Sequence, residues 1–323
     1  MLKSYKSEEL SGRLMYPVDI LLATYNGERY LDQQITSILE QQYGNWRLII
    51  RDDGSTDSTL QIISKYAQSY PEKIQLLDDT SGRLGPSGSF DKLLQFSTAP
   101  YIAFCDQDDV WLPGKLQLLK NHMVQVENRY GSEFPVLVHT DLEVVDEGLN
   151  TLADSFWLFQ KINPSKMQSL ERLLVQNCVT GCATMVNRPL VNCALPIPPG
   201  AIMHDWWLAL LAVSLGKIES IDTATVRYRQ HTGNDTGAKK WGLRFVLTGV
   251  LKTRKHYRDG LLKTREQAIA LIDSGRLYTK QNETVSNYIG LYASNWFNRR
   301  IMIARMGFYK YGLIRNIALM LWV

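Results

Sequence analysis

The sequence predicts an α/β fold in which helices cover a mostly parallel central sheet. Between residue 18 and about residue 105, short apolar runs alternate with segments of helical periodicity at the spacing of βα units, and each run ends in a polar turn. The 323 residues are 45% hydrophobic and 21% charged, which argues against a disordered, collagen-like or disulfide-scaffold protein. Because the strands of such a sheet run parallel, with right-handed crossovers between them, their carboxyl ends should share one edge, where ligands of such sheets bind.

The first third of the chain supplies four strands and three helices of this pattern. An unbroken apolar run is typical of a strand that is buried on both faces. Apolar residues three or four apart are typical of a helix with one buried face. Asp57 or Ser58 can cap the second helix. The predicted strands cover residues 18–23, 46–50, 74–77 and 101–105. The first predicted helix covers residues 28–42, the second contains Leu60, Ile63 and Ala67, and the third contains Phe90, Leu93 and Leu94.

The middle of the chain mixes helices and strands less regularly. Pro113 suits a first helical turn and opens a helix that runs to about Arg129. Prolines and a glycine between residues 196 and 200 mark a loop, and a helix follows over residues 203–215. Further strands are predicted over residues 135–139, with Asp141 just beyond, and over residues 180–186 and 225–229.

The net charge of +4 conceals two oppositely charged parts. Residues 237–323 contain 16 Lys and Arg against 4 Asp and Glu, a balance of +12, so the preceding 236 residues carry −8. Large apolar side chains stand among the basic ones, such as Trp241 beside Lys240 and Trp296 near Arg299. We therefore predict an acidic α/β body over residues 1–236 and a basic amphipathic helical region over residues 237–323.

The cysteines and the apolar segments favour a cytoplasmic protein, soluble or peripheral to a membrane. Four cysteines are too few for a disulfide framework in a chain of this size, which favours a reducing compartment. Cys178, Cys182 and Cys193 have no histidine at zinc spacing and are interpreted as small buried apolar residues. Residues 1–16 lack the apolar core of a signal peptide. No stretch reaches the ~18 uninterrupted apolar residues of a membrane span.

Carboxylates gather where the strand at 101–105 ends. Residues 106–109 are Asp-Gln-Asp-Asp, and carboxylates two apart at a strand end can converge on one divalent cation. Oxygen ligands suit Mg²⁺ or Mn²⁺, and these ions take phosphate oxygens as further ligands. The alternative is an acidic turn that only caps the next helix. Asp52 and Asp53 at a second strand end favour a cation site, because a wholly anionic pocket is unstable by self-repulsion.

Three blocks at these strand ends together resemble the signature of the family 2 glycosyltransferases. The blocks are Ala-Thr-Tyr-Asn-Gly at 23–27, Arg-Asp-Asp-Gly-Ser-Thr-Asp at 51–57 and Phe-Cys-Asp-Gln-Asp-Asp-Val-Trp-Leu-Pro at 104–113. Their order and spacing match, and the resemblance covers roughly residues 17 to 232. It implies a GT-A fold, a nucleotide-diphosphate sugar donor and inversion at the anomeric carbon. The nucleotide-sugar half would lie at about 17–112 and the acceptor half at about 113–236.

The resemblance also implies roles for individual residues. Asp106 would approach the ribose or the metal, and Asp108 would hold the metal, a Mn²⁺ or Mg²⁺ ion. Either Asp52 or Asp53 would read the pyrimidine ring, and the sequence leaves both open. The other donor-binding residues would be Thr24, Tyr25, Asn26, Glu28 and Gln107, with Arg83 and Gly85 in the loop that closes over the nucleotide.

Two residues of the acceptor half resemble further family positions. Asp205 at the start of the helix over 203–215 matches the acidic residue that deprotonates the acceptor hydroxyl, although an aspartate there is also a favourable helix cap. His231 follows the last predicted strand and resembles a histidine that completes the metal site. The alternative for His231 is a structural or solvated side chain.

The choice of donor rests on finer likeness. Residues 105–111, 203–207 and 228–231 look most like those of bacterial rhamnosyltransferases of surface polysaccharide synthesis, which suggests dTDP-L-rhamnose as donor and a glycan or lipid-linked acceptor. A UDP-hexose donor is the alternative within the family. A nucleotidyltransferase would also use two carboxylates and Mg²⁺, but residues 24–29 offer little of the Gly-rich basic loop it needs. A catalytically inactive, membrane-bound scaffold for a sugar nucleotide fits poorly with intact Asp106, Asp108 and Asp205.

The basic C-terminal region has three interpretations. Its charge of +12 would suit nucleic acid, but the interleaved aromatic and aliphatic residues argue against a nucleic-acid partner. It can pack on the body as a helical hairpin. It can also lie on an anionic lipid surface as a basic amphipathic segment. The last two can both hold. The lipid-surface interpretation predicts a protein at the inner face of the cell membrane.

Overall fold

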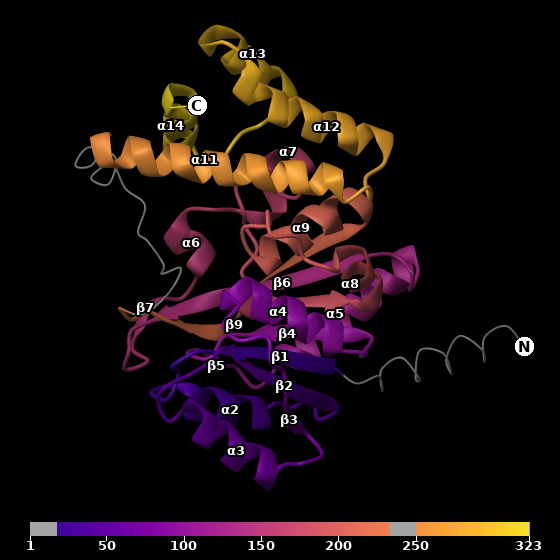
Figure 1. Ribbon diagram of the computed structural model, residues 1–323, viewed down its shortest axis with the longest axis vertical. Helices are drawn as coiled ribbons and strands as arrows, with labels where there is room; N and C mark the ends of the chain where they lie inside the picture. Colours follow the sequence, from indigo (N-terminus) through magenta and orange to yellow (C-terminus); the bar gives the residue numbers. More distant parts are fainter. Residues whose placement is uncertain (1–17, 233–249, 323) are drawn as a thin grey trace, which may run out of the picture.

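The computed structural model describes residues 18–232 and 250–322. It confirms the α/β prediction: a central sheet lies between two layers of helices, and four C-terminal helices stack beyond one of these layers (Figure 1). The predicted boundary between residues 236 and 237 lies outside the described residues, as do Lys240 and Trp241.

One half of the sheet is parallel and contains the four strands predicted from the first third of the chain. Their order is β3-β2-β1-β4. Thr24 at the end of β1 is opposite Asp52 at the end of β2, so the polar residues that follow these strands lie side by side. The bounds are β1 Val18–Thr24, β2 Trp46–Asp52, β3 Ile74–Leu76 and β4 Tyr101–Cys105.

The other half of the sheet is mixed. β8 pairs antiparallel with β4 and with β6, β9 runs parallel to β6, and β5 and β7 add short antiparallel edges. This arrangement places the end of β9 beside the turn that follows β4. The bounds are β5 Val110–Trp111, β6 Val136–Val145, β7 Thr151–Ala153, β8 Thr184–Asn187 and β9 Lys217–Arg229.

Two apolar cores lie on opposite faces of the sheet. Along β1, Leu21 contributes to one core and Ile20 and Leu22 to the other, as strand alternation requires. The first face is covered by α4 Gly85–Phe96, α7 Leu170–Leu173, α8 Arg188–Ala194 and α9 His204–Leu215, and the second by α2 Leu31–Leu39, α3 Thr59–Ser69 and α5 Lys115–Tyr130.

Several predicted elements differ in extent from the observed ones. The helix expected over 28–42 begins at Leu31, because residues 27–30 form a hydrogen-bonded turn. The strand expected over 135–139 continues to Val145, so Asp141 lies inside β6 instead of beyond it. Its buried carboxylate is accommodated there because it accepts hydrogen bonds from the Ser155 hydroxyl and the Trp157 N–H. The strand expected over 180–186 starts only at Thr184, after a 3₁₀ turn.

The C-terminal helices share the first core with the α/β body. Leu261, Ala268 and Leu271 of α11 belong to the same buried cluster as Trp207 of α9. The side chain of Gln267 also accepts a hydrogen bond of 2.9 Å from the N–H of Ile202, two residues before α9 begins. The remaining bounds are α6 Phe156–Gln160, α11 Val250–Asp273, α12 Thr279–Gly290, α13 Trp296–Met306 and α14 Leu313–Trp322, with 3₁₀ turns at Pro164–Lys166, Gly181–Ala183 and Leu291–Ala293.

The packing interpretation of the C-terminal region is therefore confirmed for its described helices. Among the helices of residues 18–232 and 250–322, none combines the length and apolar character needed to cross a bilayer.

Candidate functional site

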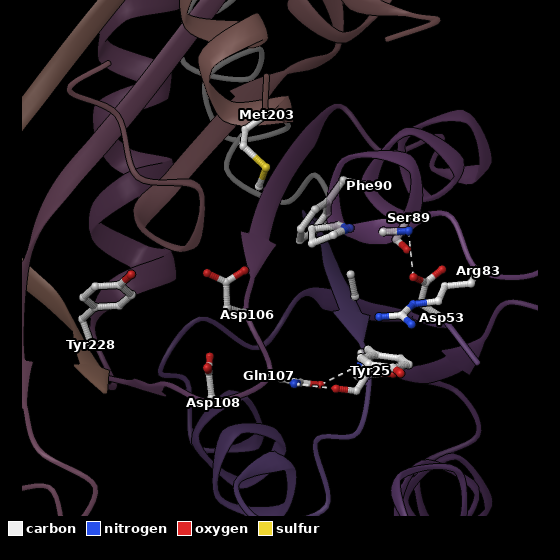
Figure 2. A pocket seen from close by; sticks show the side chains of 14 residues that line it. Tyr25, Asp53, Arg83, Ser89, Phe90, Asp106, Gln107, Asp108, Met203 and Tyr228 are labelled. Carbon is white, nitrogen blue, oxygen red and sulfur yellow. Dashed lines mark hydrogen bonds between the residues drawn. The ribbon is translucent and has the colours of Figure 1, made fainter. Parts of the chain in front are cut away.

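A cavity of about 390 Å³ opens at the carboxyl edge of β1, β2 and β4. This is the edge that the sequence predicts for a ligand, since the strand ends and the first turn of α4 form its walls (Figure 2). The lining residues are Ala23, Thr24, Tyr25, Asp53, Arg83, Gly85, Pro86, Ser89, Phe90, Asp106, Gln107, Asp108, Met203 and Tyr228.

Tyr25 forms an aromatic floor on one side of the cavity. The side chain of Gln107 holds its backbone at both polar groups, accepting from the Tyr25 N–H at 2.9 Å and donating to the Tyr25 carbonyl at 3.0 Å. The Arg83 guanidinium stacks over the Tyr25 ring, 4.0 Å from its centroid. A Cβ at Gly27 would lie 2.4 Å from Oε1 of Gln107, so glycine allows this close approach. An aromatic face backed by a cation is suited to a planar ring.

Asp53 and Asp52 occupy different positions, although they are neighbours in sequence. Asp53 is buried and lines the cavity, and its carboxylate accepts from the N–H groups of Leu84 and Gly85 at 2.7 and 2.8 Å. Despite its burial, these bonds and the guanidinium of Arg51 hold its pKa below the ordinary value. Asp52 instead closes its own turn by accepting from Ser55 and from Gly54, and it lies outside the lining.

The other residues predicted after β1 divide in the same way. Thr24 lines the cavity and donates to Asp52 at 2.9 Å. The side chains of Asn26 and Glu28 lie outside the lining and accept from the N–H groups of Thr56 and Ser58, each at 2.9 Å. In this geometry, Asn26 and Glu28 join the turns after β1 and β2.

The acidic cluster after β4 lies on the opposite side of the cavity from Tyr25. Oxygens of Asp106 and Asp109 and the sulfur of Cys182 lie within 4.8 Å of one another, an arrangement that could hold a metal ion. Burial, together with repulsion from Asp108 and Asp205, raises the pKa of Asp106 to about 7. Burial and repulsion from the same cluster also raise the pKa of Asp109. These groups are therefore costly to ionise without a nearby cation.

Asp108 and His231 lie far apart in the sequence but close together in the structure. Nε2 of His231 lies 2.8 Å from Oδ2 of Asp108, a contact between residues 123 positions apart. The sequence predicts both as metal ligands, and their proximity is compatible with that role. Asp106, Asp108 and Tyr228 line the same part of the cavity, with Tyr228 across from the two carboxylates (Figure 2).

Asp205 lies at the start of α9, beside the acidic cluster. Its two oxygens accept from the N–H of Gly181 at 3.1 Å and of Trp206 at 2.6 Å. Burial nevertheless raises its pKa to about 6. Its charge contributes to the raised pKa of Asp106, and Met203, two residues before it, lines the cavity. A carboxylate of this pKa near the cavity is suited to accept a proton.

The neighbouring His204 is buried, and its lowered pKa makes it a poor proton acceptor at neutral pH. Its buried ring stacks on Phe90, with 3.9 Å between the ring centroids, and burial lowers its pKa to about 3. A Cβ at Gly181 would lie 2.9 Å from Nε2 of His204, so this position favours glycine.

Several residues of the site, among them Tyr228, Met203, Cys182 and Asp109, have no individual role in the sequence-based prediction. Tyr228 and Met203 line the cavity, Cys182 and Asp109 join Asp106 in the cluster, and all except Asp109 come from segments distant from β4. Asp109 directly follows the predicted acidic pair, and that position is the one available signal. Cys182 is buried, in agreement with its interpretation as a small buried residue.

The fold and the site together define a glycosyltransferase of the GT-A type. The chain belongs to glycosyltransferase family 2, because the family model "Glycosyl transferase family 2" matches residues 19–194, more than half of its length.

Curated relatives of this chain use different donors. The chain is 31% identical to an Escherichia coli protein named UDP-Glc:alpha-D-GlcNAc-diphosphoundecaprenol beta-1,3-glucosyltransferase, over 66% of this chain and 77% of that protein. It is 28% identical to the dTDP-rhamnosyl transferase RfbG of Shigella flexneri, over 86% of this chain and 94% of that protein.

Solved structures share the fold at low sequence identity. S. aureus TarS 1–349 in complex with UDP-GlcNAc matches with a TM-score of 0.56 at 15% identity, over 87% of this chain and 73% of that one. The mannosyltransferase PcManGT from Pyrobaculum calidifontis, in complex with GDP-Man and Mn²⁺, matches with a TM-score of 0.51 at 14% identity, over 94% and 87%.

Proposed function

We propose that this chain is an inverting, metal-dependent glycosyltransferase that uses a nucleotide-diphosphate sugar donor. The proposal rests on one cavity that is lined by the aromatic ring of Tyr25 and by the carboxylates of Asp106 and Asp108, with the carboxylate of Asp205 behind the lining, close enough to raise the pKa of Asp106. A planar base, a diphosphate with its cation and a sugar would fill these three regions in order.

The nucleotide would be read by the residues around Tyr25. Of the two candidate aspartates, we favour Asp53 as the residue that reads the base, because Asp53 lines the cavity and Asp52 closes a turn. A carboxylate accepts hydrogen bonds but donates none when ionised, so Asp53 favours a base with an N–H on its edge, as in uracil and thymine.

The residues present fit a divalent cation. Asp106 and Asp108 supply the hard oxygen ligands that Mn²⁺ and Mg²⁺ prefer, with His231 beside Asp108. A cation bound there would stabilise the charge of the departing nucleoside diphosphate. Its positive charge would also lower the pKa of Asp106, which offsets the repulsion within the cluster.

Asp205 would act as general base. An acceptor hydroxyl attacks the anomeric carbon from the face opposite the leaving group, and its proton passes to a carboxylate oxygen of Asp205. The bond between the anomeric carbon and the phosphate oxygen breaks, and the nucleoside diphosphate departs with the bonding electron pair. A single displacement of this kind inverts the anomeric configuration.

We favour dTDP-L-rhamnose as donor, with a UDP-hexose as the second candidate. The two relatives support one choice each, since one is named a dTDP-rhamnosyl transferase and the other a UDP-Glc-dependent glucosyltransferase. A screen of nucleotide release with Mn²⁺ tests the choice. Release from a UDP-hexose but not from dTDP-rhamnose would overturn the rhamnose assignment, and release from no sugar nucleotide would overturn the proposed function.

We further propose that the acceptor is a glycan or a lipid-linked sugar in cell-surface polysaccharide synthesis, and that the C-terminal region binds the cytoplasmic face of the membrane. Trp296 and Phe297 at the start of α13 are 64% and 65% exposed, next to Arg299 and Arg300. Exposed aromatic residues beside cations suit the interface of an anionic bilayer. Leu313, Ile317 and Leu321 of α14 are also exposed.

Vesicle sedimentation tests this membrane proposal. The wild-type protein should sediment with phosphatidylglycerol vesicles and much less with phosphatidylcholine vesicles. Replacing Trp296 and Phe297 by serine should reduce the bound fraction several-fold. Leu152→Ser is the matched control, since Leu152 is also well exposed but lies on β7 in the body. Equal binding by both variants would contradict the proposed contact surface.

A further inference from the structure

Arg51 is a buried cation that no step of the proposed reaction uses. It lies on β2, two residues before Asp53, and its side chain is only 2% exposed. Burial of a guanidinium costs free energy unless its N–H groups are paired. The hydrogen-bond partners of Arg51 therefore indicate which parts of the structure it stabilises.

All the partners of Arg51 belong to one wall of the cavity or to the loop behind that wall. Its guanidinium donates to the carboxylates of Asp53, at 2.6 Å, and of Asp79. It also donates to the Ser89 hydroxyl at 2.8 Å and to the Gly82 carbonyl at 2.7 Å. Four hydrogen bonds of one side chain thus join β2, the loop over residues 77–84 and helix α4.

This loop carries Arg83, which stacks on Tyr25, and leads into the first turn of α4. Residues 80–84 are exposed, and Gly82 and Gly85 have φ values of 67° and 72°, so the loop departs from regular structure at two points. Asp53 fixes the end of the loop through the N–H groups of Leu84 and Gly85. Arg51 fixes the preceding part of the loop and Asp53 itself.

We propose that Arg51 is a positioning residue for donor binding, which holds Asp53, the loop over residues 77–84 and α4 in the arrangement that receives the nucleotide. This inference rests on the proposed function and adds a residue that would set donor affinity without contact with the donor. The role requires the planar guanidinium of arginine. The single ammonium group of lysine cannot donate to the same four acceptors, because they lie in different directions.

The test compares Arg51→Lys with Arg47→Lys. Arg47 is the matched control, since it lies on the same strand and pairs with the buried Asp19 through two N–H groups, at the opposite end of β2 from the cavity. Both variants keep their positive charge beside the buried carboxylate, which favours folding. The measurements are donor KM and kcat, the Kd for UDP and dTDP by calorimetry, and the rate of tryptic cleavage after Arg83.

For Arg51→Lys we expect a donor KM and a nucleotide Kd raised at least about tenfold, kcat at saturating donor within about threefold, and faster cleavage after Arg83. For Arg47→Lys we expect wild-type values. An unchanged Kd and cleavage rate in Arg51→Lys would overturn the inference, and so would equal losses in the two variants, which would indicate general destabilisation. Failure of the wild-type protein to bind either nucleotide would instead overturn the proposed function. The cleavage rates would still test whether Arg51 holds the loop over residues 77–84 in place.

Discussion

Replacing Asp205 by asparagine tests whether this residue is the proposed general base or only caps the helix. Asp205 accepts from the N–H groups of Gly181 and Trp206 with its two oxygens. Asparagine has one carbonyl oxygen, so it can keep one of these bonds, while its amide NH₂ faces the other N–H. Leaving one partly buried donor unpaired costs ~1–3 kcal/mol of folding free energy.

The loss of charge acts in the opposite direction. The pKa of Asp205 is raised to about 6 in the folded protein, from an ordinary value of 3.8. The folded state thus holds its proton more tightly, and its stability falls as the pH rises from about 4 to about 6. Above that range the full penalty of an ionised Asp205 is at most ~3 kcal/mol, since one pKa unit corresponds to ~1.4 kcal/mol and partial solvent access reduces it. Asparagine avoids this penalty, so Asp205→Asn should melt within a few degrees of the wild type at pH 7.

Activity should respond very differently. A positioned general base contributes roughly 10²- to 10⁴-fold, so kcat should fall by that factor, or by ~3–5 kcal/mol in activation free energy. Donor binding should remain near the wild-type level. The wild-type rate should also decline as the pH falls through about 6, where Asp205 becomes protonated, and the residual rate of the variant should lack that dependence.

The assay is nucleotide release with donor and acceptor, with melting curves and donor calorimetry on the same preparations. Asp146→Asn is the control, because Asp146 also accepts backbone N–H bonds, from Gly148 and Asn150, in an exposed turn between β6 and β7. A kcat above roughly a tenth of wild type in Asp205→Asn would refute the role of general base. Asp205 would then be interpreted as a helix cap. A large drop in melting temperature would show that removal of the buried charge does not offset the lost hydrogen bond, contrary to this reasoning.

Three further changes test other parts of the site and fold. Asp108→Asn should abolish the effect of Mn²⁺ on nucleotide affinity in calorimetry, and an undiminished Mn²⁺ effect would exclude Asp108 as a ligand. Tyr25→Ala should weaken UDP or dTDP binding by about 10- to 100-fold, because stacking of a base on an aromatic ring contributes ~1–3 kcal/mol; an unchanged Kd would remove the ring from the base site. Gly216→Ala should lower the melting temperature by many degrees, since its Cβ would lie 1.9 Å from the Pro135 carbonyl oxygen, whereas Gly44→Ala, with open space around its Cβ, should not.

The strand ends are predictable because local pattern determines them. An apolar run such as residues 101–105 must be buried, and the polar residues after it must lie at its carboxyl edge. The pattern alone therefore places Thr24, Asp53 and Asp106 on one rim. The same logic cannot separate Asp52 from Asp53, because both follow the same strand and only the turn closed by Ser55 decides which carboxylate faces the cavity.

Other features depend on partners far away in the sequence. Asp141 reads as a residue beyond a strand because a carboxylate is costly inside one, yet Ser155 and Trp157 satisfy it there. Cys182 carries no local signal that it meets Asp106 and Asp109. Contacts of this kind depend on how whole helices and strands pack together. The local pattern of a single sequence does not reveal that packing.

The shared core between α9 and α11 has a practical consequence for exchanging parts between relatives. The family model ends at residue 194, whereas Asp205 stands on a helix whose entry loop is held by Gln267 of α11. If the proposed roles hold, a chimera assembled from residues 19–194 of one enzyme and the remainder of another would take its donor-binding residues from one parent and the proposed proton acceptor from the other. The C-terminal helices would have to come from the same parent as α9, because Gln267 of α11 holds the loop that leads into α9.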